Sequence, residues 1–511
     1  MTHARRPDTL SRILIVGGGT AGWMSAALLA RSLHGSGCRI ELVEAPDIPT
    51  IGVGEATIPP IRQFNQLIGL DDRRLFAEAS ASFKLGIEFV DWLEPGQRYF
   101  HPFGVYGANL NTRYTHHKWA RLAATGRLDA DLSDFSLCSK AALSGRCGLP
   151  HPDPTQCQST LTSAYHFDAG LYAKLLRDHA QGLGVVRIEG RVETVNLDAQ
   201  TGFIQSVRLA NGRQIAADFY VDCSGQRSLL LGEALGVPFV DFKHWLPCDR
   251  AVAAPAKRSG PRLPYTRSTA RSAGWQWRIP LQHRLGQGYV HASDFIDEAA
   301  AEAEFIEGLD GELIAEPRFI PFRTGRRAVM WDKNCLAVGL SSGFLEPLES
   351  TSIHLIQTAL TRLLDHFPDR RCEVANTRAY NDLAVAEFDS IRDFLILHYK
   401  ATRRRDTAFW RHVADMDIPD ALAERIALFE ETGRVPLRTV DLFTETSWVA
   451  VFIGQGIVPV TWDPLVDNMS LDALAAEMTD QKTRIDQTVY ALPRHDQLIQ
   501  AMSGAPVSET A

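Results

Sequence analysis

The sequence predicts an α/β fold built on a Rossmann-type domain, and three features near its start support this prediction. Residues 13–16 are four consecutive branched apolar residues, which is typical of a buried parallel strand. The motif Gly-x-Gly-x-x-Gly at 17–22 follows directly and leads into a helical apolar run at 23–30. A second apolar run at 40–44 ends in a carboxylate about twenty residues beyond the last glycine. This order predicts a dinucleotide site, without distinguishing NAD from FAD.

Each part of the glycine motif has a predicted task. Gly17 allows the tight turn, Gly19 lets a pyrophosphate approach the backbone, and Gly22 lets helix and strand pack closely. The helix N-terminus supplies partial positive charge, and Glu44 suits a ribose hydroxyl. The alternative is a structural glycine turn with Glu44 on the surface. The predicted phosphate loop comprises Gly17, Gly18, Gly19, Thr20, Ala21 and Gly22.

The next hundred residues predict a second loop, a helix, a strand and a pocket wall. Segment 51–60 carries further glycines and closes with prolines, and helical spacing follows at 61–80. Residues 83–92 alternate as one strand, with Lys84 on the face opposite its apolar neighbours. The aromatic, Gly- and Pro-rich region 99–160 predicts loops and short helices.

The middle of the chain predicts a helix, antiparallel strands and a second lobe. Residues 167–180 have helical spacing, with Asp168 in the first turn. Short runs bounded by Gly, Pro and charge make 240–330 a mostly β lobe. Alternating segments that predict a β-meander are 185–197, 203–209 and 213–221.

The C-terminal part is predicted to be mostly helical. Residues 335–367 bring the chain back to the first domain as a strand, a glycine loop and a helix. A Gly- and aromatic-rich interval occupies 448–462. The predicted helices beyond the first domain are 374–400, 407–415, 420–432 and 470–488.

Composition excludes several classes of function. With 45% hydrophobic and 22% charged residues, the 511-residue chain is typical of a globular protein. The net charge of -8 argues against nucleic acid or an anionic membrane as the main partner. We find neither a secretory h-region nor a run of about eighteen apolar residues. The eight cysteines are scattered, so we expect reduced buried thiols, no metal site and a cytoplasmic location.

A short signature relates the sequence to a known family. Segment 274–280, Gly-Trp-Gln-Trp-Arg-Ile-Pro, matches the Gly-Trp-x-Trp-x-Ile-Pro signature of the flavin-dependent halogenases. The chain resembles their tryptophan halogenase group over nearly its whole length, with further matches at Trp23, 52–57, 222–225 and 347–351. The resemblance implies a flavin monooxygenase-like, FAD-binding Rossmann-type domain with a mixed β and helical substrate-binding region.

The resemblance also implies a domain division and a set of cofactor contacts. The discontinuous FAD-binding domain would comprise 1–100, 160–235 and 320–370. The substrate-binding region would comprise 101–159, 236–319 and 371–511. Beyond the phosphate loop, the residues implied to bind FAD are Glu44, Gly54, Glu55, Ala56, Val192, Gly339, Leu340 and Ile353.

Lys84 is the predicted catalytic lysine. From its strand position alone, a lysine usually points to solvent. The resemblance implies instead the family's essential lysine, which receives hypohalous acid and either forms a haloamine or donates a hydrogen bond to it. Burial among aromatic rings would lower the pKa of the Lys84 amine and make it a better nucleophile toward electrophilic halogen.

Residues 349–352 carry the other implied roles at the reaction centre. Glu349 would take the ring proton or polarise the halogenating species, and Ser350 would connect the flavin and substrate sites. Glu349 also suits a helix N-terminal carboxylate stabilised by the dipole, and both interpretations can be true. The family's halide site uses the N–H groups of a Thr-Gly pair. Here the pair is Thr351-Ser352, which leaves the halide geometry and preference open.

The resemblance assigns four aromatic residues. Trp275 and Trp277 alternate along a strand, and from spacing alone they are core residues. In the family the paired tryptophans lie beside the flavin and discourage ordinary oxygenation. His101 and Phe103 match a segment whose rings sandwich the substrate indole, although such residues in a Pro-bounded loop are more often packing residues.

One departure from the family pattern concerns the substrate. Enzymes for free tryptophan clamp its amino and carboxylate groups with a tyrosine pair and an acid, and this chain has no adjacent tyrosines. The interval between Tyr399 and Tyr490 contains 445–448 and 452–456 instead. We therefore predict an indole-like or other electron-rich aromatic substrate that is bound through its ring.

The reaction that the resemblance implies is halogenation with reduced FAD, O2 and chloride or bromide, through hypohalous acid that reaches Lys84. No second dinucleotide loop is visible, so we expect a separate flavin reductase to supply FADH2. The alternatives are a flavin-dependent aromatic hydroxylase or monooxygenase, and a flavin-binding sensor or carrier. The sequence leaves the natural substrate, the regiochemistry, the preferred halide and the oligomeric state open, including a homodimer.

Overall fold

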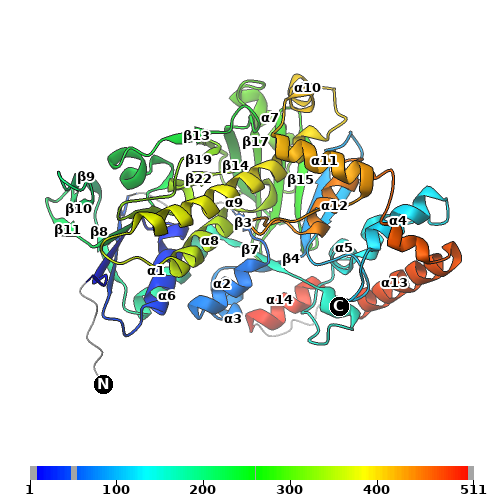
Figure 1. Ribbon diagram of the computed structural model, residues 1–511, viewed down its shortest axis with the longest axis horizontal. Helices are drawn as coiled ribbons and strands as arrows, with labels where there is room; N and C mark the ends of the chain where they lie inside the picture. Colours follow the sequence, from blue (N-terminus) through cyan, green and yellow to red (C-terminus); the bar gives the residue numbers. More distant parts are fainter. Residues whose placement is uncertain (1–7, 48–53, 259, 505–511) are drawn as a thin grey trace.

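A mostly parallel sheet at one end of the molecule carries the predicted glycine loop, as the computed structural model shows (Figure 1). The structure describes residues 8–47, 54–258 and 260–504, so 51–53 of the second glycine segment lie outside the described residues. The strand order is β20-β21-β12-β1-β2-β8, and all pairs are parallel except β20 with β21. The strands are β1 (Arg12–Val16), β2 (Arg39–Glu44), β8 (Val186–Glu189), β12 (Phe219–Asp222), β20 (Trp331–Asp332) and β21 (Cys335–Ala337).

Strand β1 is apolar from Ile13 to Val16 because both of its faces are covered there. Ile13 and Ile15 belong to the main core, on the side of the helices, whereas Leu14 packs in a second cluster with Val207 and Leu209. Continuous apolar runs are typical of such doubly covered parallel strands. The α/β Rossmann-type prediction is therefore confirmed. Helix α1 (Thr20–Ser32) packs against three other helices, which are α2 (Pro60–Ile68), α6 (Ala169–Gly182) and α8 (Ser352–Asp365).

The second face of this sheet meets an antiparallel meander at the end of the molecule (Figure 1). Its strands are β9 (Val192–Leu197), β10 (Ile204–Leu209) and β11 (Gln214–Ala216). The prediction of single strands at 185–197 and 213–221 is wrong, because each segment is divided between the parallel sheet and the meander. At the first division, the Gly190 N–H donates to the Glu44 carbonyl at 2.9 Å, and this bond ends β8 alongside β2.

The predicted strand at 83–92 is in fact two strands in different sheets. β4 (Ser82–Lys84) pairs with β7 (Ala164–Asp168), which also pairs with β3 (Gly54–Ala56). β5 (Gly86–Val90) pairs with β6 (Arg98–Pro102), so His101 lies in a strand rather than in the predicted loop. The chain changes sheets at Leu85, whose N–H donates to the Pro264 carbonyl at 2.7 Å. Lys84 therefore lies at the junction of two sheets.

The helix predicted to begin at 167 begins only at Ala169, because strand β7 extends to Asp168. Phe167 is the penultimate residue of β7, and Asp168 is the N-cap of α6 rather than part of its first turn. The Asp168 side chain accepts hydrogen bonds from the N–H groups of Gly170 and Leu171, as N-cap residues typically do.

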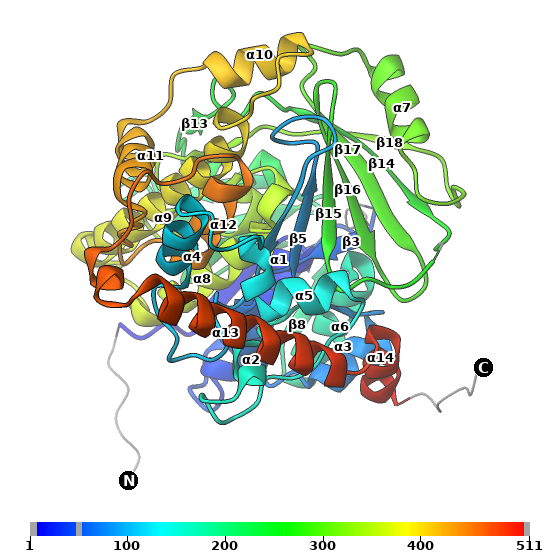
Figure 2. The same ribbon diagram turned by 90° about the vertical axis from the view of Figure 1, so that its right-hand side faces the viewer.

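The second lobe is built on a mixed sheet with the order β18-β14-β17-β16-β15-β5-β6 (Figure 2). The mostly β prediction for 240–330 is confirmed, with the helix α7 (Glu298–Glu307) as an addition. The remaining strands of this sheet are β14 (Arg250–Ala256), β15 (Thr266–Arg271), β16 (Gly274–Pro280), β17 (Leu285–His291) and β18 (Arg318–Pro321). A small sheet beside it contains β13 (Phe239–Asp241), β19 (Gly325–Arg327) and β22 (Gly343–Phe344).

Helices cover the remaining sides of the molecule, and α13 crosses beneath α4 and α5 (Figure 2). The predicted interval 448–462 is helical in its first part, where it forms the end of α12. Within the described ranges, no helix is long and apolar enough to cross a membrane. These helices are α3 (Asp72–Glu78), α4 (Thr115–Ala124), α5 (Leu137–Leu143), α9 (Val374–Lys400), α10 (Ala408–Asp415), α11 (Asp420–Thr432), α12 (Glu445–Gly454), α13 (Leu471–Ala491) and α14 (His495–Ser503).

Candidate functional site

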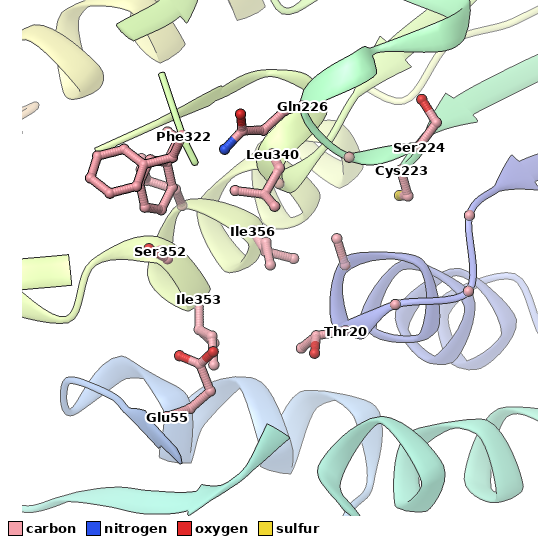
Figure 3. Close-up of a pocket in the computed structure, with 18 of the residues that line it drawn as sticks. Thr20, Glu55, Cys223, Ser224, Gln226, Phe322, Leu340, Ser352, Ile353 and Ile356 are labelled. Atoms are coloured by element: carbon pink, nitrogen blue, oxygen red, sulfur yellow. The ribbon is translucent and has the colours of Figure 1, made fainter. Parts of the chain in front are cut away.

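A cavity of about 670 Å³ extends from the glycine loop to the strand that carries Trp275 and Trp277. Figure 3 shows Thr20 on one side of it, with Glu55 and Ile353 facing it from other elements. Of the residues predicted to bind FAD, those that line the cavity are Gly17, Gly18, Gly19, Thr20, Ala21, Glu44, Gly54, Glu55, Ala56, Val192, Gly339, Leu340 and Ile353. Gly22 is outside this lining and packs beneath the loop, where a Cβ would lie 1.9 Å from the Gly17 carbonyl oxygen.

The glycine loop presents bare backbone to the cavity. Gly19 is the N-cap of α1, and no side chain of the described residues caps this helix end. A Cβ at Gly19 would meet no protein atom within 4 Å, so the space beside it is open. At Gly17, by contrast, φ is +115° and a Cβ would lie 2.1 Å from the Cys223 carbonyl oxygen. The loop thus fits a ligand with phosphate groups at a helix N-terminus.

These two glycines lead to opposite predictions. Gly17→Ala should lower the free energy of unfolding of the apoprotein by about 1–3 kcal/mol or more, because alanine is strained at this φ. Gly19→Ala should leave that stability unchanged and weaken FAD binding by about tenfold or more, since its methyl group enters the open space. Thermal unfolding without FAD and titration with FAD check both effects. If Gly19→Ala and the wild type bound FAD equally well, FAD would not bind at this loop.

Glu44 lies at the end of β2, against the glycine loop. A Cβ at Gly18 would overlap the Glu44 carboxylate, and Arg187 on β8 forms an ion pair with that carboxylate. The Glu44 side chain is therefore only 14% exposed and is paired with Arg187. Arg187 was not predicted, because the pairing of β2 with β8 joins segments that are far apart in the sequence.

Glu55 is a second carboxylate in the cavity wall. Burial and the nearby charge of Asp168 raise the pKa of Glu55 to about 7. Asp168 itself is held by Arg284 at 2.7 Å. Near neutral pH, Glu55 can therefore donate or accept a hydrogen bond to a polar ring edge.

Trp275 and Trp277 lie on β16 and line the same cavity, with ring centroids 6.2 Å apart. β16 pairs with β17 so that Trp277 faces Gly288, and a Cβ there would come within 2.1 Å of the indole. Glycine at this position therefore makes room for the Trp277 ring. Both tryptophans are buried, as the core interpretation predicts, but they also form one wall of the cavity.

Lys84 is fully buried, so the alternative of a solvent-exposed strand lysine is wrong. Its Nζ donates a hydrogen bond to Ser350 Oγ at 2.8 Å and lies 5.2 Å from the centre of the Phe103 ring. Burial lowers the pKa of the Lys84 amine from 10.5 to about 7, although the charge of Glu349 acts to raise it. A substantial fraction of this amine is therefore neutral near pH 7.

Ser350 joins the two parts of the site. It has a φ of 60° and lies between the short turn Pro347–Glu349 and helix α8. Residues other than glycine rarely adopt this left-handed backbone conformation. Here it lets Ser350 line the cavity and contact Lys84. Ser350 therefore lies between the cavity and Lys84, and its connecting role stays a prediction.

Glu349 is held by two histidines rather than by a helix terminus. His101 Nδ1 lies 3.0 Å from its carboxylate, and His398 Nε2 lies 2.9 Å from it. Burial acts to raise the pKa of Glu349, but the charges and hydrogen bonds of His101 and His398 prevail and lower it to about 2. The two histidines therefore hold this carboxylate, and α8 begins at Ser352, just beyond it.

His398 is a functional residue that sequence reasoning missed. Its Nδ1 lies 2.8 Å from the Phe394 carbonyl and its Nε2 faces Glu349, so both ring nitrogens meet acceptors. A histidine one turn after a phenylalanine in α9 gives no local signal of this contact.

Aromatic rings surround this carboxylate. The His101 ring lies 5.8 Å from Phe394, and Phe443 stacks on Phe394 at 3.8 Å. Trp448 meets Phe394 edge-on at 4.8 Å. His101 Nε2 is buried and has no hydrogen-bond partner within the described part of the chain. These rings can hold a flat aromatic substrate, with one nitrogen available to it.

The predicted halide pair lies at the start of α8. Thr351 is the N-cap, and its buried Oγ1 has no hydrogen-bond partner among the described residues. Ser352 is the first helical residue and lines the cavity. A helix N-terminus is suited to an anion, and the serine at 352 narrows the space that glycine would leave.

Together, the fold and the cavity define a Rossmann-type dinucleotide-binding enzyme with a separate buried centre of lysine and carboxylate. A family model described as tryptophan halogenase matches residues 12–471 of the chain, which belongs to that family. Tryptophan 6-halogenase from Streptomyces toxytricini is 36% identical, with 98% of this chain and 99% of that relative covered. Tryptophan 7-halogenase from Lentzea aerocolonigenes is 34% identical, with 94% of this chain and 97% of that relative covered.

Solved structures agree with this assignment. A flavin-dependent halogenase from Xanthomonas campestris has a TM-score of 0.93 and 42% identity, covering 98% of this chain and 99% of that chain. A flavin-dependent halogenase from Brevundimonas sp. BAL3 has a TM-score of 0.92 and 43% identity, covering 96% and 99%. The chain is thus a flavin-dependent halogenase, an oxidoreductase that uses reduced FAD and a halide, and the hydroxylase alternative is not favoured.

Proposed function

We propose that this enzyme halogenates an electron-rich, indole-like aromatic ring, with Lys84 transferring the halogen and Glu349 removing the ring proton. The observation that carries the proposal is the buried centre in which both side chains meet at residues 349–350. Lys84 contacts Ser350, and the neighbouring Glu349 is held between His101 and His398. The cavity of the glycine loop reaches the same turn through Ser350.

The proposed cofactor site uses the cavity lining. Residues 17–22 would receive the pyrophosphate, Glu44 a ribose hydroxyl, and Trp275 with Trp277 would flank the ring system. The open space at Gly19 and the uncapped start of α1 support this arrangement. Reduced FAD supplies the electrons that, with O2 and a halide, give hypohalous acid. Residues 351–352 would hold the halide at the helix N-terminus.

The proposed transfer step is nucleophilic capture by Lys84. The neutral amine attacks the halogen of hypohalous acid, so the N–halogen bond forms as the oxygen–halogen bond breaks. The amine loses one proton to the departing hydroxide, which leaves as water. A pKa of about 7 supplies the neutral amine that this step needs.

The aromatic ring then attacks the halogen on Lys84, and the N–halogen bond breaks. Glu349 takes the proton from the substituted ring carbon, which restores aromaticity, and the proton passes to the lysine nitrogen, which becomes the neutral amine again. Its pKa of about 2 keeps Glu349 ionised and able to accept this proton. His101 and His398 hold the carboxylate toward the ring.

Mass spectrometry provides the direct test of the function. The protein is incubated with indole, FAD, a flavin reductase, NADH and either bromide or chloride. We expect halogenated indole that depends on halide and on the reductase. A hydroxylated product would support the oxygenase class instead, and no product under any halide would support a flavin carrier.

We predict a preference for indole over free tryptophan of about tenfold or more in kcat/KM, equivalent to about 1.4 kcal/mol. The rings beyond His101 and His398 are those of Phe394, Phe443 and Trp448. The nearby cation Arg425, which lies 4.2 Å from the Trp448 ring, is already paired with Asp441 at 2.8 Å. Burying an amino acid's two charges there without partners is unfavourable. Competition between the two substrates measures the ratio. Preferred turnover of tryptophan would contradict the proposed recognition through the ring.

The remaining parts of the proposal concern the setting of the enzyme. A separate reductase would supply FADH2, the protein would act in the cytoplasm, and a homodimer is the expected assembly if it associates. The domain division described above is part of the same proposal. It is supported by the parallel sheet and the helices around α1, which come from the segments assigned to FAD. Tight NADPH binding with rapid flavin reduction by the protein alone would contradict the need for a reductase.

A further inference from the structure

We infer that His495, in the C-terminal helix α14, is a positioning residue that fixes Lys84 by binding the backbone amide of Phe83. The inference rests on the proposed role of Lys84 and adds a residue 411 positions away in the sequence, since 495 − 84 = 411. The two ring nitrogens of His495 contact Phe83 and Arg262, and within the part of the chain that the structure describes neither of these two residues lines the cavity. Its effect on the reaction would pass through strand β4.

Strand β4 needs a partner on its outer edge. On its inner edge it pairs with β7, where Phe83 faces Tyr165 and Lys84 faces Ala164. In an antiparallel pair, alternate residues direct their N–H groups away from the neighbouring strand. The Phe83 N–H donates to His495 Nε2 at 3.0 Å, so a side chain takes the place of a neighbouring strand.

The second nitrogen of His495 fixes its tautomer. His495 Nδ1 lies 2.8 Å from the Arg262 carbonyl, which only accepts, so Nδ1 carries the proton and Nε2 is left to accept from Phe83. Burial lowers the pKa of His495 to about 4, although the Arg262 carbonyl and Asp496 act to raise it. The neutral ring is therefore the form present at neutral pH, and it joins three chain segments.

The residues on both sides of Lys84 are held on this edge. Phe83 is bound by His495, and the Leu85 N–H is bound by the Pro264 carbonyl at 2.7 Å. The Phe83 ring also packs 6.2 Å from the His495 ring. With both neighbours fixed, the direction in which Lys84 leaves the backbone is fixed as well. A displacement of about 1 Å in a catalytic group can reduce a rate about 10²-fold.

Two substitutions separate the two nitrogens. His495→Asn keeps a donor near the Nδ1 position for Arg262 but removes the acceptor for Phe83. His495→Gln can place an amide oxygen near the Nε2 position and so can keep that acceptor. Ile499→Ala is the matched control, because Ile499 is a buried residue of the same helix and loses packing alone.

The experiment combines hydrogen exchange with kinetics on the full-length, FAD-loaded protein. Exchange is followed in peptides that contain 82–85, and kcat, KM for indole and free hypohalous acid are measured with a diketone trap. For His495→Asn we expect faster exchange, a kcat lowered about tenfold or more, unchanged KM, and more free hypohalous acid. His495→Gln should restore most of kcat, and Ile499→Ala should lower Tm without raising free hypohalous acid.

The possible results distinguish this inference from the proposed function. Faster exchange in His495→Asn with a wild-type kcat would overturn the positioning role, as would equal losses of kcat in His495→Asn and Ile499→Ala. Lys84→Ala is measured in parallel. If Lys84→Ala retains full activity, the proposed function fails, whereas the exchange data still report whether His495 binds the Phe83 amide.

Discussion

Lys84→Met is expected to lower aromatic halogenation about 10³-fold or more while FAD binding stays within about twofold of wild type. Methionine fills a similar volume in the buried space but has no nitrogen to capture halogen. The Lys84 amine contacts Ser350 and the Phe103 ring and does not line the cavity assigned to FAD. The reaction should therefore fail after hypohalous acid has formed, so consumption of reduced flavin should continue.

Product analysis by mass spectrometry and FAD titration by fluorescence measure these two effects. Lys140→Met is a suitable control, because Lys140 lies on α5 and pairs with Asp134 at 2.9 Å and Asp486 at 3.1 Å. It should keep wild-type halogenation. If Lys84→Met retained more than about a tenth of the wild-type activity, Lys84 would not be the nucleophile, because removal of a catalytic nucleophile lowers the rate far more than that.

A local motif allowed the glycine loop of the cavity to be predicted from the sequence. The glycines of 17–22 act through a backbone turn, which depends on adjacent residues. Strand spacing predicted only core positions for Trp275 and Trp277, and the family resemblance alone implied their place beside the flavin. The open space at Gly19 and the close contact at Gly17 are direct consequences of that motif.

The reaction centre depended on contacts that no local pattern encodes. The strand through Lys84 is interrupted because the Leu85 N–H bonds to Pro264, far along the chain. His398 contacts Glu349 from α9, and His495 contacts the Phe83 amide from α14. Their spacing gives ordinary helical patterns, so the family resemblance could supply Lys84, Glu349 and His101 but neither of these two histidines.

Helix and strand boundaries failed for a related reason. Asp168 favours both a strand end and a helix cap. Because β7 pairs with β4, the first residues of the segment predicted as a helix from 167 lie in a strand. The Gly- and aromatic-rich interval at 448–462 is not among the predicted helices, but its first part belongs to α12, which places Trp448 against Phe394. Tertiary packing outweighed local propensity at both positions.

Glu349→Gln is expected to lower kcat about 10²- to 10³-fold and to change its pH dependence. In the wild type, the neutral Lys84 amine forms as pH rises through its pKa of about 7, so kcat should rise through pH 7 and then level off. The Glu349 charge raises that pKa, and glutamine removes the charge. The rising limb of the variant should therefore move to lower pH while its plateau falls.

Rate measurements from pH 5 to 9 with indole at saturation test both parts of this expectation. Glu387→Gln is the matched control: Glu387 is also buried, lies on α9 like His398, and is held by His354 at 3.4 Å and Arg362 at 2.8 Å. Its charge is not among the influences on the Lys84 pKa, so the limb should stay in place. If the wild-type kcat fell as pH rises, hydrogen-bond donation by a charged Lys84 would be favoured. If the rising part of the kcat profile did not move in Glu349→Gln, the charge of Glu349 would not influence the pKa of Lys84. The shift and the lower plateau together would place the proton acceptor and the halogen carrier in one coupled centre, because a single removed charge would then alter both steps.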